Sequence, residues 1–227
     1  IHDKEKAIAV SVDSSANYCK AHPLTGGKQV VCENWRNLIS VGAKPIAITN
    51  CLNFGNPENP EIMGEFAECL MGIKESCEYL NYPVVSGNVS FYNGTNKKNI
   101  FPTPVIGGVG LIQKLKKPVT HLIKKENSSV VLIGKTFGHL EQSVFLEEVY
   151  SIINGRPPEV NLVNEKNNGE TILEIIQNDL VNSVHDVSGG GLILALAEMC
   201  IGTHYGVKIY KPKKLTNQFK YFFGEDQ

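Results

Sequence analysis

Hydrophobic and polar positions change period along the chain, and the changes predict strands that alternate with helices. Short apolar runs, such as the one that ends at Asp13, have the length of buried strands. Longer stretches have apolar residues at helical spacing. Gly42 is suited to end the first of these helices, and Pro60 is suited to the first turn of the second. The first part is therefore predicted to hold strands in 7–13, 43–49, 82–93 (with a turn inside) and 103–115, helices in 28–42 and 62–80, and a loop in 14–27.

The second part of the chain repeats the strand-first pattern after a charged segment over 114–127. That segment is the predicted domain boundary and divides the chain into 1–125 and 126–227. Alternating strands and helices in both parts predict an α/β or α+β fold and argue against a repeat solenoid. The second part is predicted to hold strands in 128–136 and 206–210, a strand, glycine-rich turn and buried helix in 181–201, further helices in 142–154 and 171–179, and a strand-like run in 221–223.

Composition narrows the class of protein. The chain has 227 residues and a formal net charge of -1, which argues against a nucleic-acid partner. Its six cysteines form no C-x-x-C pair and no zinc spacing, which favours a reducing compartment. No apolar run has the length of a membrane span and no signal peptide is visible, so a cytoplasmic protein without membrane contact is predicted. Because residue 1 is Ile and the chain stops soon after an apolar run, we expect a piece of a longer polypeptide.

Three junctions between a strand and a loop are rich in small and amide residues. They are TNCLNFGNPENPE (49–61), VVSGNVS (84–90) and HDVSGGGL (185–192). Glycines before an apolar helix let backbone N–H groups approach an oxyanion at the helix N-terminus. The same glycines also allow a helix and a strand to pack closely, and the sequence leaves both interpretations of HDVSGGGL open.

Individual side chains at these junctions suggest limited chemistry. Asn88 and Ser90 face the same side of an extended strand, and their oxygens are hard ligands suited to Mg²⁺ and to phosphate-bearing substrates. An Asn in a turn is nevertheless more often structural. His185 and Asp186 are neighbours on a predicted strand, so they are expected to point to opposite faces and to form no dyad. No nucleophile elbow is present, and no catalytic residue is predicted.

Together, several motifs resemble one enzyme family. CLNFGNPE, PVVSGNVSFYN, PTPVIGGVG, HDVSGGGL and FGEDQ occur in the order found in the second half of phosphoribosylformylglycinamidine synthase, and the resemblance covers essentially the whole chain. It implies the aminoimidazole ribonucleotide synthetase-like fold. In that fold an N-type domain, with a mixed sheet and helices, pairs with its counterpart in the first half. A C-type α/β domain follows, and here it would be partial.

The resemblance also implies an activity. The family is an ATP-dependent ligase of purine biosynthesis that converts formylglycinamide ribonucleotide (FGAR), ATP and ammonia to formylglycinamidine ribonucleotide, ADP and phosphate. Mg²⁺ neutralises charge in that reaction, and a glutamine amidotransferase subunit or domain supplies the ammonia. The implied partners are this amidotransferase and the first half of the same synthase. The fragment is expected to be inactive alone, because the family's catalytic His residues belong to the first half.

By the same resemblance, four residues would contact ligands. Asn50, where the family usually has Asp, and Gly87 would contact ATP. Asn88 would bind Mg²⁺ and Ser90 would contact the substrate. An alternative from another class is a non-catalytic scaffold half that holds a structural nucleotide. A relative with the same architecture, such as aminoimidazole ribonucleotide synthetase, thiamine-phosphate kinase or selenophosphate synthetase, is disfavoured by CLNFGNPE and GNVSFYN.

Overall fold

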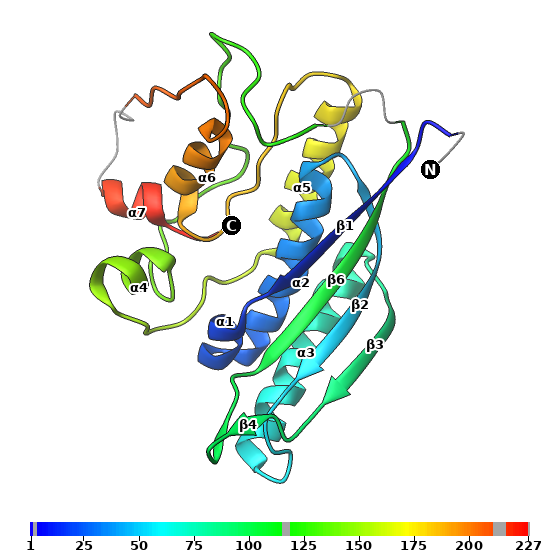
Figure 1. Cartoon of the computed structure of the whole chain (residues 1–227), viewed down its shortest axis with the longest axis vertical. Helices are drawn as coiled ribbons and strands as arrows, with labels where there is room; N and C mark the ends of the chain where they lie inside the picture. Colours follow the sequence, from blue (N-terminus) through cyan, green and yellow to red (C-terminus); the bar gives the residue numbers. More distant parts are fainter. Residues whose placement is uncertain (2–3, 115–118, 211–216, 227) are drawn as a thin grey trace.

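The first part of the chain is a sheet covered on one face by helices (Figure 1). The computed structural model describes residues 1, 4–114, 119–210 and 217–226. The sheet has the strand order β1-β6-β2-β3. β6 is antiparallel to β1 and β2, whereas β3 is parallel to β2, so the sheet is mixed, as predicted. The strands are β1 (Ala7–Ser14), β2 (Lys44–Asn53), β3 (Val84–Ser90) and β6 (Thr103–Ile112), and a small ribbon pairs β4 (Gly94–Thr95) with β5 (Lys98–Asn99).

The helices of the first part are α1 (Ala16–Ala21), α2 (Pro23–Ser40) and α3 (Pro60–Leu80). The predicted loop over 14–27 was wrong, because α1 and the first turn of α2 lie there. Pro23 fits the first turn of α2, and the His22 ring accepts a hydrogen bond from the Thr25 N–H at 3.3 Å. Gly27, which suggested a loop, lies where α3 approaches closely: a Cβ there would stand 2.4 Å from the Cys69 carbonyl oxygen.

The segment 82–93 forms one strand rather than strand, turn and strand. β3 is continuous through Gly87, and the chain turns only after Ser90. The Asn93 side chain holds that turn by donating to the carbonyl oxygens of Phe54 at 3.0 Å and Ser90 at 2.9 Å. The bend that the glycine suggested is therefore displaced by three residues along the chain.

The core lies between the sheet and the two long helices. Ile48, Leu52 and Ile106 bring their side chains from β2 and β6 to the helical side and are buried. The other side of the sheet carries exposed apolar residues, because side chains alternate along a strand. Ile8, Val10 and Val12 of β1 and Val109 of β6 are on that open face, and Val10 is 68% exposed.

A polar network crosses the core where β1, α2 and the end of α3 meet. The Asp13 carboxylate accepts hydrogen bonds from the Asn34 and Asn37 amides, each at 2.7 Å. The buried Tyr82 hydroxyl donates to Asn34 Oδ1 at 2.7 Å. Tyr82 and Asn34 have no exposed surface, so this bond satisfies polar atoms that water cannot reach.

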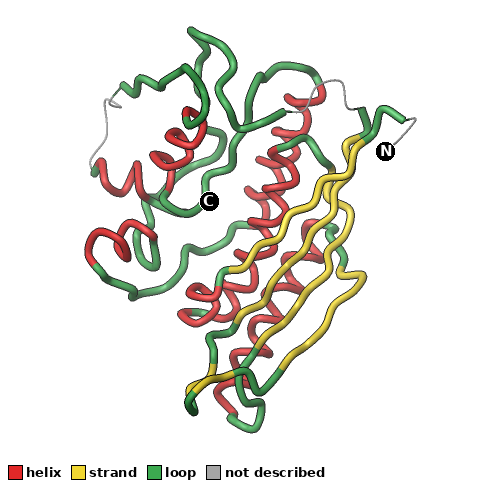
Figure 2. The backbone as a smooth tube through the Cα atoms, viewed as in Figure 1, coloured by secondary structure: helices red, strands yellow, loops and turns green. Residues whose placement is uncertain are grey.

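The second part is built from helices joined by irregular segments. Its helices are α4 (Val144–Tyr150), α5 (Leu162–Gln177), α6 (Gly191–Cys200) and α7 (Gln218–Phe223). Figure 2 shows helices and loops but no strand in this part, within the described residues. The predicted strands 128–136, 181–187 and 206–210 were therefore wrong, and the strand-like run 221–223 is the end of α7.

The missing strands have a physical reason. A strand needs a neighbour for its backbone groups, and among the described residues these segments have only the single parallel bridge between Thr120 and Ser183. Their apolar side chains are consequently uncovered: Val131 is 74% exposed and Tyr210 is 75% exposed. The run 221–223 is helical because Phe223 stacks on Phe145 of α4, with ring centroids 4.3 Å apart.

The two parts meet along α2. The Gln29 side chain donates to the Pro158 carbonyl oxygen at 2.6 Å, and Arg36 Nη1 lies 3.5 Å from Glu165 Oε2 of α5. Residues 115–118 of the predicted boundary segment are outside the described residues, and the division into 1–125 and 126–227 stays a prediction. In the part of the chain that the structure describes, no helix is both long enough and apolar enough to cross a bilayer.

The Tyr82 hydroxyl gives a stability test. We expect Tyr82→Phe to lower the free energy of unfolding by about 1–3 kcal/mol, because Asn34 Oδ1 would lose its buried donor. Urea denaturation of parent and variant measures the change. Tyr79→Phe is the matched control, since Tyr79 lies in the last turn of α3, three residues before Tyr82, but is 42% exposed. Equal effects of the two variants would contradict the role given to the buried bond.

Candidate functional site

The residues predicted to contact ligands gather where β3 runs beside β2. Asn50 is in register with Gly87, Cys51 with Asn88, and Asn53 with Ser90. Residues in register on neighbouring strands point to the same face of a sheet, and successive residues point to opposite faces. The structure therefore brings the four predicted residues together along the strand but places them on two faces. Asn50 and Gly87 belong to the helical face, and Asn88 and Ser90 belong to the open face.

A one-residue bulge determines this division. Ile48 pairs with Val84, but Thr49 pairs with Ser86, so Val85 is an extra residue in β3. Because the side-chain period is two, an extra residue exchanges the faces of everything that follows it. Without the bulge, Asn88 would face the helices and Gly87 would face outward.

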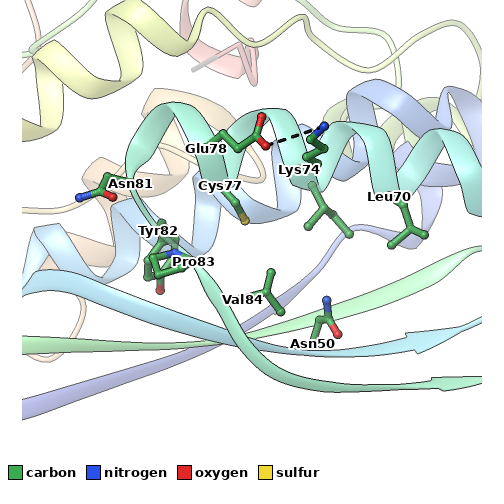
Figure 3. A pocket seen from close by; sticks show the side chains of 10 residues that line it. Asn50, Leu70, Lys74, Cys77, Glu78, Asn81, Tyr82, Pro83 and Val84 are labelled. Atoms are coloured by element: carbon green, nitrogen blue, oxygen red, sulfur yellow. Dashed lines mark ion pairs between the residues drawn. The ribbon is translucent and has the colours of Figure 1, made fainter.

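On the helical face, Asn50 points from β2 toward α3 at the floor of a groove (Figure 3). The groove has a volume of about 380 Å³. Most of its wall is apolar, and polar groups stand at its floor and rim. Its lining consists of Asn50, Leu70, Ile73, Lys74, Cys77, Glu78, Asn81, Tyr82, Pro83 and Val84.

Gly87 keeps space for the Asn50 side chain. A Cβ built on Gly87 would lie 1.9 Å from Asn50 Oδ1, which is far inside contact distance. A larger residue would therefore push the amide out of its place. Asn50 and Gly87 stay predicted ligand contacts, and Lys74 and Glu78, which the sequence did not single out, also line the groove. Their spacing from Leu70 along the predicted helix placed them on one stripe, and that was the available signal.

On the open face, Asn88 is exposed and Ser90 is partly covered. The Ser90 hydroxyl donates to Asn93 Oδ1 at 3.3 Å. The Asn88 amide offers one hard oxygen, which suits Mg²⁺. The described residues contain no group of three or more His, Cys, Asp or Glu that could hold a metal ion. The assignment of Asn88 as an Mg²⁺ ligand stays a prediction.

The amide-rich loop 49–61 is largely occupied with its own backbone. Asn56 Oδ1 accepts from the Glu58 N–H and Asn59 Oδ1 accepts from the Glu61 N–H, each at 2.9 Å. Asn59 is thereby the N-cap of α3. Asn53 donates to the Thr103 carbonyl oxygen at 3.2 Å. Most amides of this loop hold the turn, and Asn50 is the exception.

A carboxylate of the chain itself, that of Glu225, lies at the glycine-rich turn before α6. Glu225 Oε1 accepts from the Gly190 N–H at 2.7 Å and from the Val144 N–H at 2.8 Å. The Tyr18 hydroxyl of α1 donates to Glu225 Oε2 at 2.9 Å. Glu225 is 2% exposed. A carboxylate of the chain thus takes the place that an oxyanion ligand would need at Gly190.

His185 and Asp186 form a hydrogen bond, which the sequence-based analysis did not expect. His185 Nδ1 lies 3.2 Å from Asp186 Oδ1, and Nε2 lies 2.9 Å from Glu198 Oε2 of α6. The strand predicted around them is irregular, so strict alternation does not apply. The hydrogen bond with Asp186 raises the pKa of His185. Burial opposes ionisation of Asp186, but the hydrogen bond from His185 and the charge of Arg36 outweigh it and lower its pKa.

Comparison with known proteins identifies the family. The family described as AIR synthase related protein, N-terminal domain, matches residues 1–112, and the corresponding C-terminal domain matches residues 125–226. The chain belongs to the AIR synthase related proteins. This result agrees with the family resemblance of the motifs and with the mixed α/β fold.

Curated relatives within this family are synthase subunits. A protein of Pelagibacter ubique (strain HTCC1062) named phosphoribosylformylglycinamidine synthase subunit PurL is 60% identical over 227 residues, covering 100% of this chain and 31% of the relative. A protein of the same name from Bradyrhizobium diazoefficiens is 50% identical over 228 residues, again covering 100% of this chain and 31% of the relative. The chain therefore spans about 31% of the length of these relatives.

Solved structures share the fold. Thermotoga maritima PurL complexed with FGAR superposes with a TM-score of 0.58 at 22% identity, covering 87% of this chain and 28% of that chain. AaThiL complexed with AMPPCP and TMP superposes with a TM-score of 0.51 at 17% identity, covering 86% of this chain and 60% of that chain. At these identities the likeness supports the AIR synthase related fold alone.

The His185 pair predicts a pH dependence. The folded pKa of His185 is raised, so its stabilisation is fully present below the unfolded pKa of about 6.5 and is lost as pH rises through the folded value. The pKa of Asp186 is lowered, so its contribution fails only in acid. We expect the stability advantage of the parent over His185→Gln to shrink by on the order of 1 kcal/mol between pH 6 and pH 9.

Thermal unfolding at several pH values measures this advantage. His204→Gln is the control, because His204 is exposed and has no carboxylate partner among the described residues. An advantage of the parent over His185→Gln that stays constant from pH 6 to pH 9 would contradict the charge assigned to this pair.

Proposed function

We propose that the chain is the second-half portion of a phosphoribosylformylglycinamidine synthase. The whole enzyme would convert FGAR, ATP and glutamine-derived ammonia to formylglycinamidine ribonucleotide, ADP and phosphate. The observation that carries the proposal is the 60% identity to a synthase subunit across all 227 residues. The residues at the β2–β3 junction are consistent with it, since the chain has an amide, a glycine and a hydroxyl where ligand contacts are needed.

Each residue at the junction has a proposed role. Asn50 and Gly87 contact ATP from the helical face. Asn88 is one Mg²⁺ ligand and Ser90 contacts FGAR from the open face. When bound, Mg²⁺ would neutralise phosphate charge. Because neither face carries a general acid or base among these four residues, the chain lends contacts to a site completed by another part of the protein.

The first half of the synthase is the proposed partner that completes the site. The open face of the sheet exposes Ile8, Val10, Val12 and Val109, and such a contiguous apolar surface is typical of an interface. Asn88 and Ser90 share this face by register. Packing of the first half on the open face would therefore cover the apolar residues and bring its ligands to Asn88.

Two further proposals concern the source of the ammonia and the cellular location of the enzyme. A glutamine amidotransferase subunit or domain would supply ammonia. A cytoplasmic location is supported by the cysteines, which are all free thiols. The rival scaffold function, with a nucleotide held as a structural element, receives less support, because Glu225 already fills the glycine-rich turn that would bind its phosphate.

The metal role of Asn88 is tested in the full-length synthase. We expect Asn88→Ala to reduce FGAR-dependent ADP release at least about tenfold, because a hard Mg²⁺ ligand is removed. High Mg²⁺ should restore part of the rate. Circular dichroism verifies that the variant is folded, and Asn96→Ala, in the nearby ribbon turn, is the matched control. An unchanged rate for Asn88→Ala would contradict the metal role.

The open face is tested by placing a charge on it. We expect Val10→Asp in the full-length synthase to cost about 2 kcal/mol or more of stability, because an unpaired carboxylate would be buried under the first half. Thermal unfolding measures the change. Met71→Asp is the control, since Met71 is 54% exposed on α3, on the helical side. If both substitutions are tolerated equally, the open face is not the interface.

A further inference from the structure

We propose that the Asn93 side chain makes the Ser90 hydroxyl a hydrogen-bond acceptor toward the substrate, so that Ser90 binds an amide N–H of the formylglycinamide group rather than the phosphate of FGAR. This inference rests on the proposed substrate contact of Ser90. It goes further by naming the residue that directs the hydroxyl and the part of the substrate that the hydroxyl meets. Asn93 is a positioning residue, since it acts through Ser90.

Two backbone carbonyls fix the orientation of the Asn93 amide. Asn93 Nδ2 donates to the carbonyl oxygen of Phe54 at 3.0 Å and to that of Ser90 at 2.9 Å. A carbonyl oxygen only accepts hydrogen bonds, so the amide can face these two atoms with its nitrogen but not with its oxygen. Phe54 directly follows β2 and Ser90 ends β3, so the side chain joins the ends of two neighbouring strands.

The oxygen of the same amide directs the Ser90 hydroxyl. Ser90 Oγ lies 3.3 Å from Asn93 Oδ1 and 3.1 Å from Asn93 Nδ2. Nδ2 has two hydrogens, and the two carbonyl oxygens are the nearer acceptors for them. The Ser90 hydroxyl therefore gives its hydrogen to Oδ1. A hydroxyl has one hydrogen and two lone pairs, so lone pairs remain for a ligand, and that ligand has to supply a donor.

The parts of the substrate differ in what they can supply. The formylglycinamide group of FGAR has amide N–H groups, which are donors. An ionised phosphate has acceptor oxygens alone, and these would face the lone pairs of Ser90 Oγ without a hydrogen between them. The direction of the Ser90 hydroxyl thus favours the formylglycinamide group and opposes the phosphate.

The position of Ser90 agrees with this assignment. Ser90 and Asn88 are two residues apart on one face of β3, so about 7 Å separates them along the strand. With ATP phosphates held near Asn88, as proposed, the amide oxygen that accepts the phosphoryl group has to lie next to them. The formylglycinamide group is therefore the part of FGAR that comes nearest to Ser90.

The test measures equilibrium binding by calorimetry in the full-length synthase, without ATP and therefore without turnover. FGAR is compared with ribose 5-phosphate, which has the phosphate and the sugar but no amide. We expect Ser90→Ala to weaken FGAR binding at least about threefold and to leave the Kd of ribose 5-phosphate within about twofold. Equal weakening of both ligands would overturn the inference. A parent that does not bind FGAR would instead overturn the proposed function.

A second variant tests the positioning role of Asn93. We expect Asn93→Ala to weaken FGAR binding at least about threefold in the parent but less than about twofold in the Ser90→Ala background, because it acts through the hydroxyl. Asn178→Ala is the matched control, since the Asn178 side chain also donates to a backbone carbonyl, that of Glu174 at 2.9 Å, at the end of α5.

Circular dichroism verifies that each variant is folded. Equal effects of Asn93→Ala in the two backgrounds, or the same loss in Asn178→Ala, would overturn the positioning role. If Asn93→Ala does not fold, Ser90→Ala still decides which part of FGAR is bound, because it leaves the Asn93 amide in place.

Discussion

The arrangement of the site depends on the parallel pairing of β3 with β2, and in particular on the extra residue at Val85. A strand offers only two faces, and one inserted residue exchanges them for everything that follows. The bulge therefore sets the direction of Gly87, Asn88 and Ser90 together. It gives the helical face a glycine beside Asn50 and gives the open face an amide and a hydroxyl.

Several elements of the first part could be predicted because their signals are local, although α1 and the first turn of α2 were missed. Pro60 and the apolar period of α3 gave its position, and the apolar run before Asp13 gave β1. The shared side of Asn88 and Ser90 also followed from strand alternation. Which face of the sheet Asn88 and Ser90 point to could not be predicted, because it depends on a bulge between partner strands that are distant in sequence. The hydroxyl of Tyr82 and the amide of Asn34 were likewise invisible as partners, being 48 residues apart.

The second part of the chain shows that segments with strand propensity can fail to form strands. Apolar β-branched runs such as the one around Val131 have strand propensity, but a strand forms only when a neighbouring strand pairs with its backbone groups. Among the described residues the segment around Val131 pairs with no strand, and the Val131 side chain is exposed. Hydrogen bonds to one buried carboxylate connect segments of this part instead. Glu225 links Gly190, Val144 and Tyr18, and these residues belong to segments that sequence spacing could not connect.

The residues proposed to contact ligands share one physical property: Asn50, Gly87, Asn88 and Ser90 are all uncharged. Neutral amides and hydroxyls orient a polyanionic nucleotide without repelling it, but they give a divalent cation little affinity compared with carboxylates. If these four residues contact ligands as proposed, they supply hydrogen-bonding groups for a nucleotide but no anionic ligand for a metal ion. If the carboxylates come from the first half, the metal binds well only after the open face is covered. The apolar surface that stabilises the association of the halves would then also confine catalysis to the assembled protein.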